Sequence, residues 1–200
     1  MTPPPFHHGN LRAALLEEAR RTLRDGSVED LSLRELARRA GVSHGAPRSH
    51  FADRQALLDA LAEQGFEHLT RQLADAGAAH PDDLTGRLRA VARAYVGFAV
   101  TDPGLMDLMF STKGTGAPQH VQAAAGRLFS TFASLFEEDL RAGRIAGSDP
   151  ERTRLLFVAV LQGIASLISS RRIAPAQGDL LVDDAVALLV TGAGPEDPHR

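Results

Sequence analysis

The side chains best suited to recognition chemistry lie between Ser32 and Arg54. Serine hydroxyl and arginine guanidinium groups donate hydrogen bonds to phosphate oxygens, and the arginine fork also matches the O6 and N7 atoms of guanine. Ser32 and Ser43 each precede a short segment of helical pattern, where a helix N-terminus presents free N–H groups to an anion. This combination indicates binding to a polyanion.

Two short helices are needed to position these side chains. Ser32 is a predicted N-cap, and Glu35 three residues later completes a capping box. Apolar residues recur at spacings of three and four on one face, which we expect to be buried: Leu33, Leu36, Ala37 and Ala40. The charged residues face outward: Arg34, Glu35, Arg38 and Arg39.

A glycine turn separates the two helices. Gly41 can adopt the left-handed C-cap conformation, and Val42 can then pack back on the first helix. Ser43 is the predicted N-cap of the second helix, which runs to about His50. Pro47 lies about four positions into that helix, near the end of the turn whose N–H groups lack intrahelical partners.

A third helix must close this small bundle, because two helices this short bury little apolar surface alone. Residues 9 to 25 supply it and end at Gly26. The expected buried face consists of Leu11, Ala14, Leu15, Ala19 and Leu23.

The assembly resembles the DNA-binding domain of the tetracycline-repressor (TetR-type) family of bacterial transcription regulators. Three blocks carry the resemblance in the expected order: H-H-G-N-L-R-A-A-L-L-E-E-A from His7, L-S-L-R-E-L-A-R-R-A-G-V-S from Leu31, and H-F-A-D-R-Q-A-L-L from His50. Together they cover roughly the first 60 residues. The chain departs from the family at Arg48, where a tyrosine is usual, and at Arg54, where a lysine is usual.

The residue types and the resemblance together predict the DNA contacts. Arg48 suits either a guanine or a phosphate, whereas Gly45 and Ala46 lack bulk and would let the backbone approach the groove. For His50 we favour a structural role, packing or capping within the domain, over a contact with DNA. The predicted contact residues are Ser32, Arg34, Ser43, His44, Gly45, Ala46, Arg48, His50 and Arg54.

Composition limits the class of protein. The 200 residues contain 44% hydrophobic residues, no cysteine, no secretory signal and no apolar run long enough for a transmembrane helix, which predicts a cytoplasmic protein. Disulfides, thiolate catalysis and cysteine metal sites are excluded. The net charge is −3, but residues 1 to 54 hold nine arginines against seven acidic residues, so the positive end is the predicted DNA-binding end.

The remainder of the chain has an all-helical pattern without strand alternation. Asp53 caps a long helix to about residue 76 that links a helix-turn-helix domain, residues 1 to 54, to a larger domain, residues 55 to 191. Further helices are expected at residues 84 to 101, 103 to 110, 119 to 144, 151 to 170 and 179 to 190, with a loop at 111 to 118 and a disordered tail at 192 to 200. The predicted fold is all-α, with about nine helices.

Residues 94 to 110, A-Y-V-G-F-A-V-T-D-P-G-L-M-D-L-M-F, resemble a C-terminal ligand-sensing domain of one branch of the family. That branch often shows W-x-x-x-H-G, where this chain has Val158 and Gln162-Gly163. Methionines and aromatics suit an adaptable apolar pocket, although ordinary core packing is the alternative for each one. The candidate ligand-binding residues are Tyr95, Phe98, Met106, Met109, Phe129, Phe132 and Gln162.

The polar residues outside these two candidate sites are expected to have no catalytic or metal-binding role. The adjacent His7 and His8 lack a third metal ligand, so we expect a phosphate-contacting arm and no metal site. Lys113, the only lysine, is expected to be a solvated loop charge, with an anionic ligand as the alternative. The acidic groups are expected to be solvated, and no residue pattern predicts catalysis or a cofactor: Glu137-Glu138-Asp139, Asp82-Asp83 and Asp183-Asp184.

These observations favour a homodimeric, ligand-responsive transcription repressor that binds a near-palindromic operator. The resemblance implies that the last two long helices, about residues 151 to 190, pack against a second copy through Leu155, Val158, Leu161, Leu180, Leu188 and Leu189. The partners are then double-stranded DNA, a second copy and a small-molecule effector. The rival interpretations are a small-molecule binding protein with a vestigial helix-turn-helix and, with no supporting motif, an enzyme that uses the helical cavity.

Overall fold

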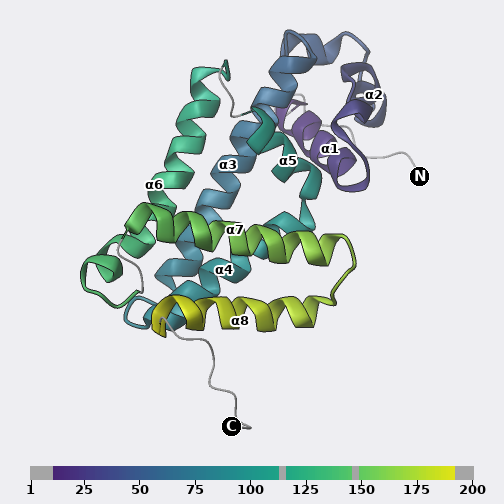
Figure 1. Ribbon diagram of the computed structural model, residues 1–200. Coiled ribbons are helices and arrows are strands. Elements are labelled where there is room, and N and C mark those ends of the chain that lie inside the picture. The colour runs from purple at the N-terminus through teal and green to yellow at the C-terminus, as the bar shows by residue number, and fades with distance from the viewer. Residues whose placement is uncertain (1–10, 113–115, 146–148, 192–200) are drawn as a thin grey trace. The chain divides into compact units, whose positions relative to one another are not determined.

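The computed structural model describes residues 11–112, 116–145 and 149–191 (Figure 1). Within these ranges the chain forms eight α-helices and two short 3₁₀ helices, and no strand. The all-α prediction is therefore confirmed. One α-helix fewer than expected is present, because the second short helix of the helix-turn-helix is a 3₁₀ helix.

The chain divides into two compact units. The first contains the described residues of Met1–Phe66 together with Asp102–Ala124, and the second contains Glu67–Thr101 together with the described residues from Ala125 onward. The long helix α3, Arg54–Ala78, belongs to both units along the chain. The functional division expected after residue 54 stays a prediction.

The first unit is built around α1. Its elements are α1 (Leu11–Asp25), η2 (Val28–Asp30), α2 (Leu33–Arg39), η3 (Ala46–Ser49), the first half of α3, α5 (Pro103–Thr112) and the first residues of α6 (Gln119–Arg141). Helix α1 contacts α2, η3 and α5. Six of the nine residues predicted to be buried lie in the core together with Phe51: Leu15, Ala19, Leu23, Leu36, Ala37 and Ala40. The other three are only half-buried: Leu11, Ala14 and Leu33.

A buried carboxylate joins α1 to α5. Asp102 is 1% exposed, and it accepts hydrogen bonds from Arg20 Nη2 at 2.6 Å and Arg24 Nε at 2.5 Å. Burial alone would raise the Asp102 pKa, but the hydrogen bonds from the two arginines outweigh it, so the pKa is lowered. A Cβ on Gly104 would lie 2.5 Å from the carbonyl oxygen of Leu23, so this close approach of the two helices requires glycine.

The second unit contains α4 (Leu84–Thr101), the C-terminal part of α6 (Gln119–Arg141), α7 (Pro150–Ser169) and α8 (Pro175–Thr191). Helices α4, α7 and α8 contact one another. Figure 1 shows α7 and α8 running side by side in opposite directions. Their shared inner face includes Phe157, Leu161, Val182 and Val186.

Local signals placed several helix ends correctly. Asp53 accepts the Ala56 N–H at 2.8 Å, and Asp149 accepts the N–H groups of Glu151 and Arg152. The final helix begins at Pro175, four residues earlier than expected. The Ala174 N–H there is bonded to the Gln177 side chain, and a proline at the first helical position is compatible with a helix start.

The prediction that the acidic groups are solvated is wrong for Asp139 and Asp183. Asp139 is 2% exposed, and its carboxylate binds Arg87 and, at 2.6 Å, Arg144. Asp183 is half-buried and accepts from Arg89 Nε at 2.7 Å. Four arginines pair with these two carboxylates, and no sequence pattern linked them to the acids. Three lie on α4 and one follows α6: Arg87, Arg89, Arg93 and Arg144.

Helix α7 is, by length and composition, the one described helix that could cross a membrane. Only 28% of its apolar window is buried within the chain. A single helix of this kind is weak evidence for a membrane protein, since helices of soluble proteins can have the same length and composition. Apolar side chains are exposed on both α7 and the neighbouring α8, and this exposure needs an explanation other than a membrane.

Candidate nucleic-acid interface

Helix α2 has well-defined ends that fix the turn. The Ser32 hydroxyl accepts the Glu35 N–H at 3.2 Å, as predicted for an N-cap. At the other end Gly41 has φ +67°, its N–H bonds the Arg38 carbonyl, and the Val42 N–H bonds the Ala37 carbonyl. This pair of bonds is a Schellman motif, so the predicted glycine C-cap is confirmed.

The capping box, by contrast, is incomplete. The Glu35 carboxylate accepts hydrogen bonds from Arg38 and Arg39, at 2.6 to 2.9 Å, and so serves the end of α2 instead of its start. These hydrogen bonds, from Arg38 first and Arg39 second, lower the pKa of Glu35 to about 2. Two of the three exposed arginines of α2 are thus already paired.

The second helix of the motif differs from the prediction. Ser43 does not cap an α-helix through His50; a 3₁₀ helix, η3, covers only Ala46–Ser49, and Gly45 is its N-cap. Pro47 has no N–H for the i→i−4 bond to the Ser43 carbonyl, so the Ala46 N–H takes that carbonyl at 3.0 Å. The proline therefore changes the helix type, an effect that the sequence analysis underestimated.

The recognition segment, residues 43–50, is exposed apart from the half-buried Ala46 and the buried Pro47. The Arg48 side chain has no hydrogen-bond or ion-pair partner within the described residues, so its guanidinium is available to an external acceptor. His50 is exposed and forms the C-cap of η3 through its backbone N–H. Its capping role is through the backbone, whereas its side chain is not packed in the core.

Gly45 stands in open space. A Cβ added there would meet no atom within 4 Å, and its φ of −85° is available to any residue. Neither backbone strain nor packing inside the chain therefore requires a glycine at this exposed position. The close approach of DNA at Gly45 stays a prediction.

Arg54 has an internal role that the sequence did not reveal. Its Nε donates to the Leu31 carbonyl at 2.8 Å, and its Nη2 donates to the Val28 carbonyl. The side chain thereby joins the first turn of α3 to the segment that leads into α2. Its predicted phosphate contact stays a prediction, and would use the donors that remain.

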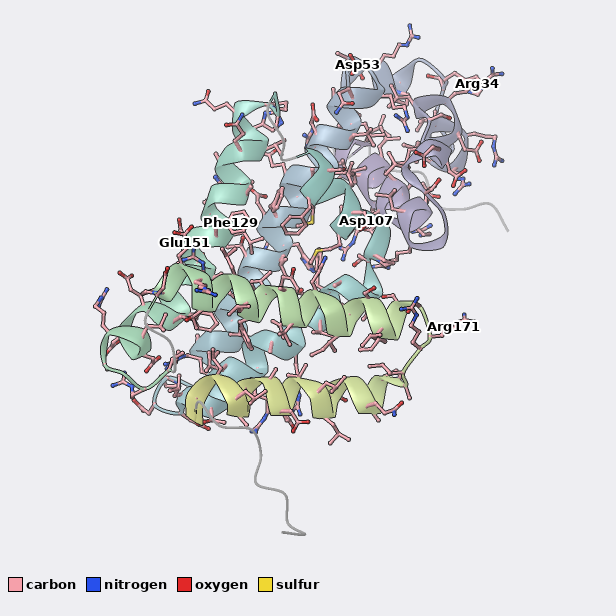
Figure 2. All side chains as sticks on the ribbon, in the orientation of Figure 1. Arg34, Asp53, Asp107, Phe129, Glu151 and Arg171 are labelled. Atoms are coloured by element: carbon pink, nitrogen blue, oxygen red, sulfur yellow. The ribbon has the colours of Figure 1, made fainter. Side chains whose placement is uncertain are left out.

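Two further arginines, Arg34 and Arg12, are exposed in the helix-turn-helix unit. Arg34 is exposed on α2 and, unlike Arg38 and Arg39, forms no ion pair in the part of the chain that is described; Figure 2 shows its side chain extending outward from the helix. Arg12 was missed by sequence reasoning. It is exposed and lies with its Cζ 5.4 Å from the ring centroid of Phe51, which directly follows the recognition segment.

The predicted ligand-binding residues fall into both units. Met106 and Met109 are buried in the first, while Tyr95, Phe98 and Phe132 are buried and Phe129 is half-buried in the second. The Tyr95 hydroxyl donates to the Oε1 atom of Gln162 at 3.0 Å, which brings two of the candidates into contact. Burial raises the pKa of Tyr95 to about 12, so it is a neutral donor at physiological pH.

Several predictions concern residues outside the described ranges. They are the arm with His7 and His8, the loop cation Lys113, and the tail at 192 to 200. The predicted contacts of these residues stay predictions.

Comparison with known families agrees with this geometry. Residues 15–61 match the family described as bacterial regulatory proteins, tetR family, and residues 88–191 match the tetracyclin repressor-like C-terminal domain. The first match contains the helix-turn-helix, and the second contains α7 and α8. The chain therefore belongs to the TetR family of transcriptional regulators.

Individual relatives are regulators as well. The chain is 30% identical over 167 residues to the HTH-type transcriptional regulator BetI of Cronobacter sakazakii, which covers 78% of this chain and 75% of the relative. It is 28% identical to the HTH-type transcriptional regulator Rv1816 of Mycobacterium tuberculosis, over 70% of this chain and 61% of that protein.

Solved structures share the fold. A protein of unknown function from Rhodococcus sp. RHA1 superposes with a TM-score of 0.84 at 41% identity, covering 96% of this chain and 99% of the other. A bacterial regulatory protein in the tetR family from Rhodococcus RHA1 superposes with a TM-score of 0.69 at 19% identity, covering 94% and 100%. The family is regulatory, and the protein is a DNA-binding transcriptional regulator.

Proposed function

We propose that this protein is a cytoplasmic, homodimeric repressor that a small-molecule ligand releases from a near-palindromic operator. Each copy contributes one recognition segment, residues 43–50. Arg48 reads a base or clamps a phosphate, while Ser32, Ser43 and Arg34 bind the DNA backbone. The observation that carries the DNA-binding part is the exposed, unpaired Arg48 beside the open Gly45, held by a helix-turn-helix with defined caps.

The homodimer is supported by the distribution of exposed apolar side chains. Among the described residues every large hydrophobic side chain that is exposed lies on α7 or α8, at 38 to 64% exposure: Leu155, Leu156, Val160, Leu180, Leu181 and Leu188. Exposed apolar side chains gathered on two helices that contact each other are typical of a protein interface. Leu161 is fully buried within the chain, so it is not available to this interface, contrary to expectation.

The ligand response is supported by the match of residues 88–191 to a repressor-like C-terminal domain and by the buried aromatic side chains of α4, Tyr95 and Phe98. A ligand that binds more tightly to a conformation that fits DNA poorly shifts the population away from the operator complex. No catalytic step is needed, which agrees with the regulatory character of the family.

The substitution Arg48→Ala tests the DNA-binding part. Loss of a base or phosphate contact of about 1 to 3 kcal/mol predicts operator affinity roughly 5- to 150-fold weaker, with unchanged dimerisation. The measurement is titration of a selected operator at two salt concentrations. If Arg48 reads a base, binding to unrelated DNA is unchanged; if it clamps a phosphate, both affinities fall and the salt dependence decreases.

The matched control is Arg71→Ala, because Arg71 is an exposed arginine on α3 outside the recognition region. This control should bind the operator like the wild type. Normal operator affinity for Arg48→Ala itself contradicts the assignment.

A further inference from the structure

One side chain of α7 connects the interior of the second unit to its apolar surface. Gln162 is exposed, yet its Oε1 atom accepts the hydroxyl proton of Tyr95 at 3.0 Å. Tyr95 is 4% exposed and comes from α4, beneath α7. The two amide hydrogens of Gln162 have no acceptor in the described part of the chain. The hydrogen bond from Tyr95 to the Gln162 oxygen fixes the orientation of the amide group, and therefore the position of its nitrogen.

The surroundings of Gln162 are those of a contact surface. Leu155, Leu156 and Val160 precede it on the exposed side of α7. The next residue, Gly163, is exposed, and a Cβ added there would meet no atom within 4 Å. A glycine with open space around it in the middle of a 20-residue helix is not required by packing within the chain, and costs stability relative to alanine.

Charge complementarity identifies a second copy of this chain as the occupant. The segment from the N-cap of α7 to the turn after this helix carries a balance of +2, with the two acidic residues Asp149 and Glu151 against four arginines: Arg152, Arg154, Arg171 and Arg172. Helix α8 has three aspartates and no basic residue, and Asp179 and Asp184 are exposed. Two-fold pairing places the basic helix of one copy along the acidic helix of the other.

We propose that Gln162 sets the register of the dimer, with its amide N–H groups donating to the second copy beside Gly163, where the two α7 helices cross most closely. Tyr95 acts through Gln162 as a positioning residue, because its hydroxyl fixes which way the amide points. This inference rests on the proposed homodimer. It makes the dimer contact depend on the hydrogen bond of a side chain in the core of the second unit.

The register is tested by analytical ultracentrifugation of the full chain from nanomolar to micromolar concentration. Gly163→Leu fills the crossing point and should raise the dimer dissociation constant more than 100-fold. Gly126→Leu is the matched control, since Gly126 is also exposed on a helix with open space around its Cα. The Gly126→Leu control should dimerise like the wild type. If Gly163→Leu also dimerises like the wild type, the inference is overturned.

The role of Tyr95 is tested by a double-mutant cycle on the same dissociation constant. Tyr95→Phe and Gln162→Ala should each weaken the dimer about 5-fold or more, as expected for one hydrogen bond, and the double variant should be no weaker than Gln162→Ala alone. If the tyrosine has a purely structural role, Tyr95→Phe lowers the unfolding temperature. The dimer dissociation constants are then unchanged, or the effects of the two substitutions are additive. Either result overturns the proposal.

The wild type separates this failure from a failure of the proposed function. A wild-type dimer with unaffected variants leaves the homodimer intact and removes only the role of Gln162 and Tyr95. A wild type that stays monomeric throughout the concentration range contradicts the homodimer as well.

Discussion

The arginines around the helix-turn-helix fall into two groups according to their contacts. Arg38 and Arg39 bind Glu35, and Arg54 binds backbone carbonyls of Val28 and Leu31. Arg34 and Arg48 have no such contacts among the described residues. At the residue scale, this division predicts which side chains shape the domain and which are available to DNA, although all have the same charge.

Arg54→Ala should act mainly on stability. Removing the two hydrogen bonds to the carbonyls is expected to lower the free energy of unfolding by about 1 to 3 kcal/mol, because each is a charge-assisted bond. Arg54→Lys, which keeps the charge but not the fork, should lose most of the same stability. The measurement is denaturant unfolding followed by helical circular dichroism. Unchanged stability combined with weaker DNA binding would instead make Arg54 a phosphate contact.

At the element scale, local sequence signals predicted the helix ends well. Ser32, Gly41, Asp53 and Asp149 act through neighbours within a few residues, so their roles could be derived from spacing alone. The 3₁₀ form of η3 follows from Pro47, a local feature whose effect was underestimated. Contacts between residues far apart in the sequence could not be derived in this way, since no alternation or spacing links them: Arg12 with Phe51, Arg24 with Asp102, and Arg87 with Asp139.

The link between α1 and α5 predicts a pH dependence. The Asp102 pKa is lowered in the folded protein, so the stability that its charge contributes is present above the unfolded value near 3.8 and is lost as the pH falls through the folded-state pKa. Asp102→Asn should cost roughly 2 to 3 kcal/mol at neutral pH, less than a fully buried pair because Arg24 is partly exposed. The unfolding free energies of the wild type and of Asp102→Asn, measured from pH 7 downward, should converge in acid.

An exposed ion pair provides the control for that experiment. Glu137 and Arg141 on α6 lie 2.6 Å apart but are both largely exposed. Glu137→Gln should therefore change stability by less than about 0.5 kcal/mol at any pH. An Asp102→Asn variant as stable as this control would show that the buried pair does not hold α1 on α5.

The turn between α7 and α8 contains a strained residue. Arg171 has φ +57° and occupies the position after the C-cap, where glycine is usual; Figure 2 shows it at this turn. Arg171→Gly should raise the free energy of unfolding by about 1 kcal/mol, because the left-handed conformation disfavours a side chain. Arg172→Gly is the control and should not stabilise, since Arg172 lacks a positive φ. Equal effects in thermal unfolding would contradict the strain argument.

At the scale of the whole molecule, the proposed function depends on pairing two copies. A single recognition segment, residues 43–50, in which only the four residues of η3 are helical, offers few base contacts, and the excess of positive charge in residues 1 to 54 is small. Two such segments about 34 Å apart, one turn of DNA, would double the contacts and read a symmetric site. The exposed apolar side chains of α7 and α8 are the observation that supports the proposed pairing.

The most direct test of a dimeric, sequence-specific regulator is selection of bound fragments from a random DNA pool by the purified full-length protein at a fixed salt concentration. The proposed function predicts a near-palindromic motif whose half-site centres lie about one helical turn apart. Enrichment of a single unpaired half-site would contradict the homodimeric operator complex. Recovery of fragments with no motif above the non-specific background would contradict sequence-specific binding itself.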